Sequence, residues 1–302
     1  MPDTHENESD VTTVAVVGVG TMGSGMAANL RKAGLTTIVW DRNPSAAAPL
    51  AELGATVAAT VSDAARSADI VITMVPDRDA VTSVAVDQGM LAALPAGAIW
   101  AQMGTIGVAA TDGLAALTAS RRPDVSFVDA PVSGSKGPAE RGELIVLASG
   151  PQEVVDRLAP VFDAVGRKTV WMGDAGRGTR LKLVLNTWVA FLMEGLAETV
   201  ALGDELGITH AELADALEDG PLAAPQAIAK LHKIDARDYD AEFALGWALK
   251  DVHFALESVG RLPALAAIGQ QWERAVAEGY GGLDISAARL ALEPQSARLR
   301  SA

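Results

Sequence analysis

A lysine and an asparagine are set into an apolar stretch in the second half of this chain. From Gly176 to Gly207 there is no proline, and apolar residues fill nearly every face of a helical wheel, which is typical of a buried helix with Thr179 as its N-cap. Lys182 and Asn186 are four residues apart and would lie on one face of that helix. Such a pair suits general acid–base chemistry, in which the ammonium group moves a proton and the amide orients the reacting molecule. The alternative is a first-turn lysine whose ammonium group reaches water.

A glycine-rich turn near the N-terminus indicates a dinucleotide site. GVGTMG follows a short valine-rich run and opens a helical pattern, and a second apolar run comes after it. In this context the first glycine permits a tight turn, the second lets a pyrophosphate approach the backbone, and the third lets helix and strand pack closely. The alternative, a turn that only closes a strand–helix corner, is disfavoured by the same context. The expected cofactor contacts in this turn are Gly18, Gly20, Thr21, Met22 and Gly23.

Two neighbouring charged residues bear on the choice of cofactor. Asp41 ends the second apolar run and could accept hydrogen bonds from the adenine-ribose hydroxyls, which favours NAD. Arg42 could pair with a 2′-phosphate, which favours NADP, although a solvated loop arginine explains it too. We expect a slight preference for NADP, with use of both cofactors plausible.

Strand and helix patterns alternate as far as Trp171. They predict a doubly wound parallel sheet of the Rossmann type, in which ligands bind outside the carboxyl ends of the strands. One clear strand ends at Val75 and is closed by Pro76, and we expect these two residues to contact the cofactor. A plain strand-to-helix turn would have the same sequence.

A second turn, Ser133-Gly134-Ser135-Lys136, follows a later strand. Its small residues expose backbone N–H groups that could form a nest for a carboxylate. A β-turn rich in turn-forming residues explains the same stretch equally well.

The composition narrows the classes of function. A net charge of −14 argues against nucleic acid and anionic membrane as partners, and leaves a small carboxylate-bearing substrate open. The chain has no cysteine, and its four histidines are scattered, so we expect no metal site.

The chain of 302 residues is long enough for two domains. Residues 1–11 are expected to be a flexible tail without the apolar core of a signal peptide, which predicts a cytoplasmic protein. Residues 12–175 are expected to form the NAD(P)-binding Rossmann domain. Residues 176–302 are expected to form an all-α domain for substrate binding and dimerisation, joined through the long helix, and its apolar surface predicts burial against a second copy.

Four stretches, taken in order, resemble the β-hydroxyacid dehydrogenase family, which includes 3-hydroxyisobutyrate dehydrogenases and tartronate semialdehyde reductases. They are GVGTMG at 18–23, DAPVSGSKGPAERGEL at 129–144, GRGTRLKLVLN at 176–186 and LKD at 249–251. The Pro-Val-Ser-Gly-Ser-Lys run is most similar to the glyoxylate/succinic semialdehyde reductase branch. The resemblance implies reversible hydride transfer between a nicotinamide and a small semialdehyde or 3-hydroxy acid, in a homodimer or tetramer built on the helical half.

The resemblance also implies roles for the candidate residues. Lys182 would be the catalytic acid or base, and Asn186 would hold the substrate beside it. Ser133 and Gly134 would bind the substrate carboxylate.

Further residues follow from the same resemblance. Thr105 would contact the nicotinamide half of the cofactor, and Lys250 would close over the cofactor. The chain departs from the family around Thr105, where an acidic residue, a Ser or Thr and a proline are usual and this chain has Gln102, Gly104 and Val108.

Two alternative functions remain open. Imine reductases are further relatives but usually replace the catalytic lysine, so Lys182 speaks against that branch. A non-catalytic dinucleotide sensor would have no need of a proton donor.

Overall fold

The computed structural model describes residues 12–218 and 220–293. The chain divides into two compact units, Met1–Lys182 and Leu183–Ala302. The division lies within the long helix α9 (Arg177–Leu206), a few residues beyond the expected boundary at 175. Each unit is described by itself below.

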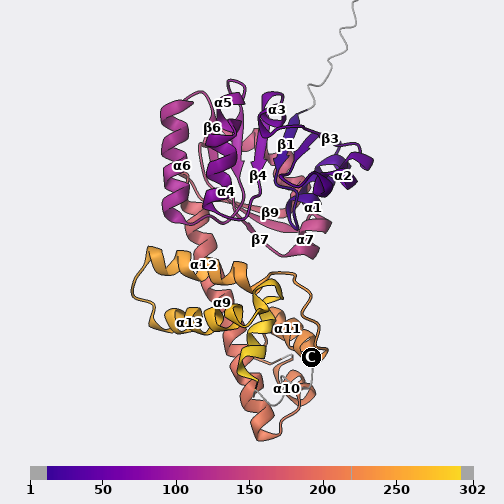
Figure 1. The fold of residues 1–302 in the computed structure, drawn as a ribbon, viewed down its shortest axis with the longest axis vertical. Helices are drawn as coiled ribbons and strands as arrows, with labels where there is room; N and C mark the ends of the chain where they lie inside the picture. The colour runs from indigo at the N-terminus through magenta and orange to yellow at the C-terminus, as the bar shows by residue number, and fades with distance from the viewer. Residues whose placement is uncertain (1–11, 219, 294–302) are drawn as a thin grey trace, which may run out of the picture. The chain divides into compact units, whose positions relative to one another are not determined.

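The first unit is built on a six-stranded parallel sheet in the order β3-β2-β1-β4-β5-β6 (Figure 1). The strand order reverses between β1 and β4, which is the switch point where doubly wound folds bind their ligands. This confirms the predicted fold class. The strands are β1 (Thr13–Val17), β2 (Thr36–Trp40), β3 (Thr56–Val57), β4 (Ile70–Thr73), β5 (Ile99–Gln102) and β6 (Ser126–Asp129).

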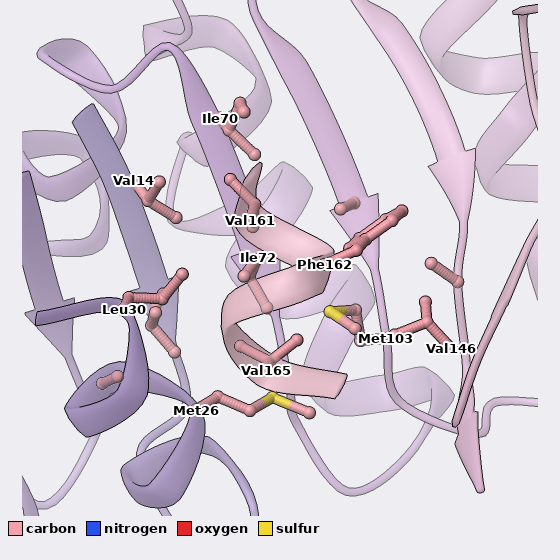
Figure 2. Packing of buried hydrophobic residues seen from close by; sticks show 14 of the residues in the cluster. Val14, Met26, Leu30, Ile70, Ile72, Met103, Val146, Val161, Phe162 and Val165 are labelled. Carbon is pink, nitrogen blue, oxygen red and sulfur yellow. The ribbon is translucent and has the colours of Figure 1, made fainter. Parts of the chain in front are cut away.

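Helices pack against both faces of this sheet because successive strand residues point to opposite faces. Val14 and Val16 belong to one buried cluster, and Ala15 and Val17 to the other. Figure 2 shows the first cluster, in which side chains of α8 pack with those of β1 and β4. The helical segments are α1 (Gly23–Lys32), α2 (Pro44–Glu52), α3 (Val61–Arg66), α4 (Arg78–Thr82), η1 (Ser83–Asp87), α5 (Met90–Ala93), α6 (Val108–Arg121), α7 (Lys136–Arg141), η2 (Gln152–Val154) and α8 (Val155–Val165).

The strands beyond residue 130 form a second sheet and do not extend the first. It contains β7 (Val132–Ser133), β8 (Leu144–Ala148) and β9 (Gly166–Trp171) in that order. β7 runs antiparallel to β8, and β8 runs parallel to β9. The sequence pattern assigned β8 and β9 to the doubly wound sheet, and that detail was wrong because apolar runs do not reveal which sheet a strand joins.

The second unit is helical in the part that the structure describes. Its core packs the middle of α9, around Ala190 and Met193, against α12 and α13. Its elements after α9 are α10 (His210–Leu217), α11 (Pro225–Asp235), α12 (Leu245–Ser258), α13 (Pro263–Ala277), η3 (Tyr280–Gly282) and η4 (Ile285–Leu292).

The helix α9 runs unbroken from Arg177 to Leu206. Thr179 therefore lies in its first turn and not at the N-cap. Among the described residues, α9 is the one helix long and apolar enough to cross a membrane by length and composition. Core helices of globular proteins meet the same two criteria, so this is weak evidence for a membrane span.

Candidate active site

The glycine-rich turn after β1 has the geometry that a pyrophosphate-binding turn requires. Gly18 has φ +93°, and a Cβ there would lie 2.5 Å from the carbonyl oxygen of Met74. A Cβ at Gly23 would lie 2.0 Å from the carbonyl oxygen of Gly18, so the start of α1 packs directly on the turn. At Gly20 a Cβ would meet nothing within 4 Å, and this glycine is exposed.

The start of α1 is open to an anion as well. Met22 stands at its N-cap and makes no side-chain capping hydrogen bond. The N–H groups of a first turn carry a partial positive charge, which suits a phosphate. The residues present therefore fit a dinucleotide, whose pyrophosphate the exposed Gly20 and Thr21 would hold at the start of α1.

Asp41 follows β2 and holds the backbone around it. Its Oδ2 accepts a hydrogen bond from the Val19 N–H at 2.9 Å, and its Oδ1 accepts one from the Asn43 N–H at 2.8 Å. Each oxygen keeps a further lone pair that a ribose hydroxyl could use. Arg42 is exposed at the same strand end, so both cofactor signatures lie next to the glycine-rich turn.

Two further loops meet the turn at the carboxyl edge of the sheet. A Cβ at Gly18 would lie 3.0 Å from Cγ1 of Val75, and a Cβ at Gly104 would lie 2.6 Å from the Val75 carbonyl oxygen. The structure thus brings together the glycine-rich turn, the Val75–Pro76 loop after β4 and the Gly104–Thr105 loop after β5. Thr105 is half-buried and Pro76 is exposed.

A buried carboxylate holds the first turn of α9. Asp129, at the end of β6, is fully buried and accepts hydrogen bonds from the Thr179 N–H at 2.7 Å and the Thr179 hydroxyl at 2.6 Å. The Ser149 hydroxyl also contacts it, at 3.3 Å. Burial raises the pKa of Asp129, and the hydrogen bonds from Thr179 and Ser149 oppose that rise.

The same turn is pressed against β8. The Gly178 N–H donates to the Ser149 hydroxyl at 2.9 Å, and a Cβ at Gly178 would lie 2.1 Å from the Leu147 carbonyl oxygen. No side chain fits there. The anchored turn leads directly to Lys182, which is half-buried.

The predicted carboxylate-binding residues, Ser133 and Gly134, come shortly after Asp129 along the chain. Ser133 ends β7, four residues after Asp129, and is half-buried. Gly134 has φ +135°, and a Cβ there would lie 2.7 Å from Cδ2 of Leu144, so the turn requires glycine. Asp129 therefore fixes both the strand end that leads to Ser133 and the helix turn that leads to Lys182.

Asn186 has a partner in the second unit that the sequence did not reveal. Its Nδ2 donates to Oδ2 of Asp251 on α12 at 2.5 Å. Asp251 is buried, and its Oδ1 lies 3.3 Å from the Nζ of Lys250. The Nζ of Lys250 lies 5.1 Å from the ring centre of Phe254 and 5.8 Å from that of Trp247. The LKD motif contained Asp251, but its pairing with Asn186 spans 65 positions and has no local signal.

Among the described residues there is no group of three or more His, Cys, Asp or Glu side chains that could hold a metal ion. Sequence reasoning did not single out Asp129 and Asp251, because their partners Thr179 and Asn186 lie 50 and 65 positions away.

Both units match known protein families. Residues 13–173 match the model described as the NAD binding domain of 6-phosphogluconate dehydrogenase. Residues 176–292 match the model described as NAD-binding of NADP-dependent 3-hydroxyisobutyrate dehydrogenase.

Individual proteins are similar over nearly the whole chain. Glyoxylate/succinic semialdehyde reductase 1 of Arabidopsis thaliana is 32% identical over 279 residues, which cover 91% of this chain and 96% of that protein. The chloroplastic glyoxylate/succinic semialdehyde reductase 2 of the same plant is 31% identical over 98% of this chain and 84% of its own length. The crystal structure of a 3-hydroxyisobutyrate dehydrogenase from Salmonella typhimurium has a TM-score of 0.84 at 28% identity, covering 92% of this chain and 99% of that one.

A dinucleotide-binding turn has therefore been found at the switch point of a doubly wound sheet, and both halves of the chain match models of nicotinamide-dependent dehydrogenases. The expected resemblance is confirmed, and the chain belongs to the β-hydroxyacid dehydrogenase family of NAD(P)-dependent oxidoreductases.

Proposed function

We propose that this enzyme interconverts a small, carboxylate-bearing semialdehyde and the corresponding hydroxy acid, with Lys182 as the general acid and base. The observation that carries the proposal is the buried Asp129 anchor. It ties the helix turn before Lys182 to the strand end before Ser133, through the two hydrogen bonds from Thr179. A proton donor and a carboxylate-binding loop that share one anchor can act on two ends of one small molecule.

Each residue has a role in this scheme. When bound, the nicotinamide supplies or accepts the hydride. In the direction of reduction, the ammonium group of Lys182 gives a proton to the oxygen of the substrate carbonyl, and in oxidation its amine takes that proton back. Ser133 and Gly134 bind the substrate carboxylate through the hydroxyl and the backbone N–H. Asn186 holds the substrate beside Lys182, and its own amide is oriented by the bond to Asp251.

The cofactor preference is proposed to lean toward NADP(H). Arg42 is exposed at the end of β2, where its guanidinium can pair with a 2′-phosphate. Asp41 already accepts two backbone N–H bonds, which partly neutralise its charge near that phosphate. Initial rates with NADPH and NADH in parallel test this, and at least a tenfold preference for NADH would reverse the assignment.

Assembly is proposed to be a homodimer or tetramer built on the helical unit. An exposed apolar stripe on α9 supports this, with Val184 65%, Trp188 61%, Leu202 61% and Leu206 69% exposed. Light scattering after size-exclusion chromatography measures the mass of the particle, and a monomer at micromolar concentration would contradict the proposal. The enzyme is proposed to work in the cytoplasm, without nucleic acid or membrane as a partner.

A substrate screen tests the function. Glyoxylate, succinic semialdehyde, tartronate semialdehyde and methylmalonate semialdehyde are each offered with NADPH and with NADH, and cofactor oxidation is followed by absorbance. We expect turnover of at least one. Cyclic imines in the same screen test for imine reduction, and cofactor binding without turnover of any compound would favour a sensor.

The variant Lys182→Ala tests the assigned proton donor. We expect its turnover to fall by a factor of about 10² to 10⁴, because general acid–base catalysis contributes that much. Its affinity for the cofactor, measured by fluorescence, should stay close to that of the wild type. Turnover near the wild-type rate would remove Lys182 from the mechanism.

A further inference from the structure

A chain of buried polar groups lies at the ends of β4 and β5. The Trp100 Nε1–H donates to the Thr73 hydroxyl at 2.9 Å, and that hydroxyl donates to Oε1 of Gln102 at 3.2 Å. Oε1 of Gln102 also accepts from the Gly104 N–H at 3.1 Å, and its Nε2 donates to the Gly104 carbonyl oxygen at 2.6 Å. Trp100, Thr73 and Gln102 are each 0% exposed.

The donor and the acceptor of each hydrogen bond among these buried groups can be assigned. The Gly104 N–H can only donate and the Gly104 carbonyl can only accept, so Oε1 of Gln102 faces the N–H and Nε2 faces the carbonyl. The Thr73 hydroxyl accepts from the Trp100 indole N–H and donates to that oxygen. A carboxylate of the same length could accept both bonds but has no proton for that carbonyl. An uncharged side chain that both accepts and donates is needed at position 102.

The turn that Gln102 closes touches a neighbouring loop. A Cβ at Gly104 would lie 2.6 Å from the Val75 carbonyl oxygen and 3.4 Å from Oε1 of Gln102. The backbone of this turn thus rests directly on the loop that carries Val75 and Pro76. Thr105 follows at once, so the conformation of the turn decides where Thr105 lies relative to Val75.

We infer that Gln102 is a positioning residue for cofactor binding. Its amide clamps both the N–H and the carbonyl of Gly104, and so holds Thr105 at the spacing from the Val75–Pro76 loop that the nicotinamide half of the cofactor needs. The Gln102 amide fills the hydrogen bonds of a turn that has no room for a side chain at Gly104. The inference rests on the proposed cofactor contacts of Thr105 and Val75.

The variant Gln102→Glu tests this inference, because it places a titratable carboxyl group where the amide lies. When protonated, the new carboxyl group has the shape of the amide and can donate to the Gly104 carbonyl in its place. When ionised, it faces that carbonyl oxygen without a proton. Burial raises the pKa of such a carboxyl group, so the two forms interconvert between about pH 5 and about pH 9.

Cofactor affinity is measured by the fluorescence of bound NADPH across this pH range. We expect Gln102→Glu to match the wild type at the acid end and to bind about tenfold more weakly at the alkaline end, the effect of leaving one buried acceptor unpaired. Thr118→Val is the matched control, because it removes another buried hydroxyl, one bonded to Leu114 within α6. The control should lose stability but keep the affinity and pH profile of the wild type.

Circular dichroism at each pH verifies that every variant is folded. A folded Gln102→Glu variant whose affinity follows the wild type at every pH would overturn the inference, as would a Thr118→Val variant with the same pH dependence. The binding measurement needs no substrate. A substrate screen without turnover would therefore refute the proposed reaction but would not affect the conclusion about Gln102.

Discussion

Removing the Asp129 carboxylate should destabilise the protein far more than removing an exposed carboxylate nearby. In Asp129→Ala the N–H and the hydroxyl of Thr179 lose their acceptor in a buried site. Each buried donor left unpaired costs about 1–3 kcal/mol, and a negative group at a helix N-terminus contributes about 0.3–2 kcal/mol. The two unpaired donors and the helix-end contribution together predict that the free energy of unfolding falls by about 2–8 kcal/mol.

Urea denaturation followed by tryptophan fluorescence measures this loss. The matched control is Asp112→Ala, which removes a carboxylate from the neighbouring Arg180, at 2.8 Å in a pair that is about half exposed on both sides. Exposed pairs contribute at most about 1 kcal/mol. A loss below about 1 kcal/mol in Asp129→Ala, equal to the control, would show that the α9 turn does not depend on this carboxylate.

The Asp129 variant should also lose turnover, because the turn before Lys182 is no longer held. Asp129→Asn separates the two effects. Its oxygen can accept from the Thr179 N–H, and the Thr179 hydroxyl can rotate to accept from its amide. We expect Asn to restore most of the stability and at least a tenth of the wild-type turnover, whereas Ala restores neither. Full turnover in a folded Ala variant would refute the positioning argument.

Two further predictions concern the helical unit. Glu194 is buried, with Oε2 accepting from Trp272 and Oε1 unpartnered among the described residues, and burial raises its pKa to about 7. The folded state therefore holds a proton that the unfolded state releases, so stability should fall as the pH rises from about 4.5 to about 7, by about 3 kcal/mol. Glu194→Gln should remove most of that slope in thermal melts, and an unchanged slope would assign it to other groups. In Asp251→Ala the amide of Asn186 loses its acceptor, so we expect the KM for substrate to rise about tenfold with the KM for cofactor unchanged, and equal changes in both would argue for a general loss of structure.

The glycine-rich turn could be predicted in detail because its demands are local. The positive φ at Gly18 and the packing of Gly23 on the Gly18 carbonyl are set within one strand–helix corner. The long helix was equally clear, since the absence of proline and the apolar pattern around Lys182 are properties of a continuous segment.

Other features depend on contacts between distant positions. The bond between Asp129 and Thr179 spans 50 positions, and that between Asn186 and Asp251 spans 65. The direction of β7 was equally hidden, because a strand of two residues carries no pattern of its own. Gln102 was noticed as a departure from the family, but its role appears only when Thr73 and Gly104 are placed around it.

The shared helix has a consequence for dissecting this enzyme into pieces. A truncated nucleotide-binding fragment ending at 175, where the sequence suggests a cut, would lack Thr179 and leave the buried carboxyl group of Asp129 without those two donors. Extending the fragment through Lys182 retains those donors but ends α9 fewer than two turns after its start at Arg177. Neither cut leaves an intact folding unit, so we expect the two units to require expression as a single polypeptide.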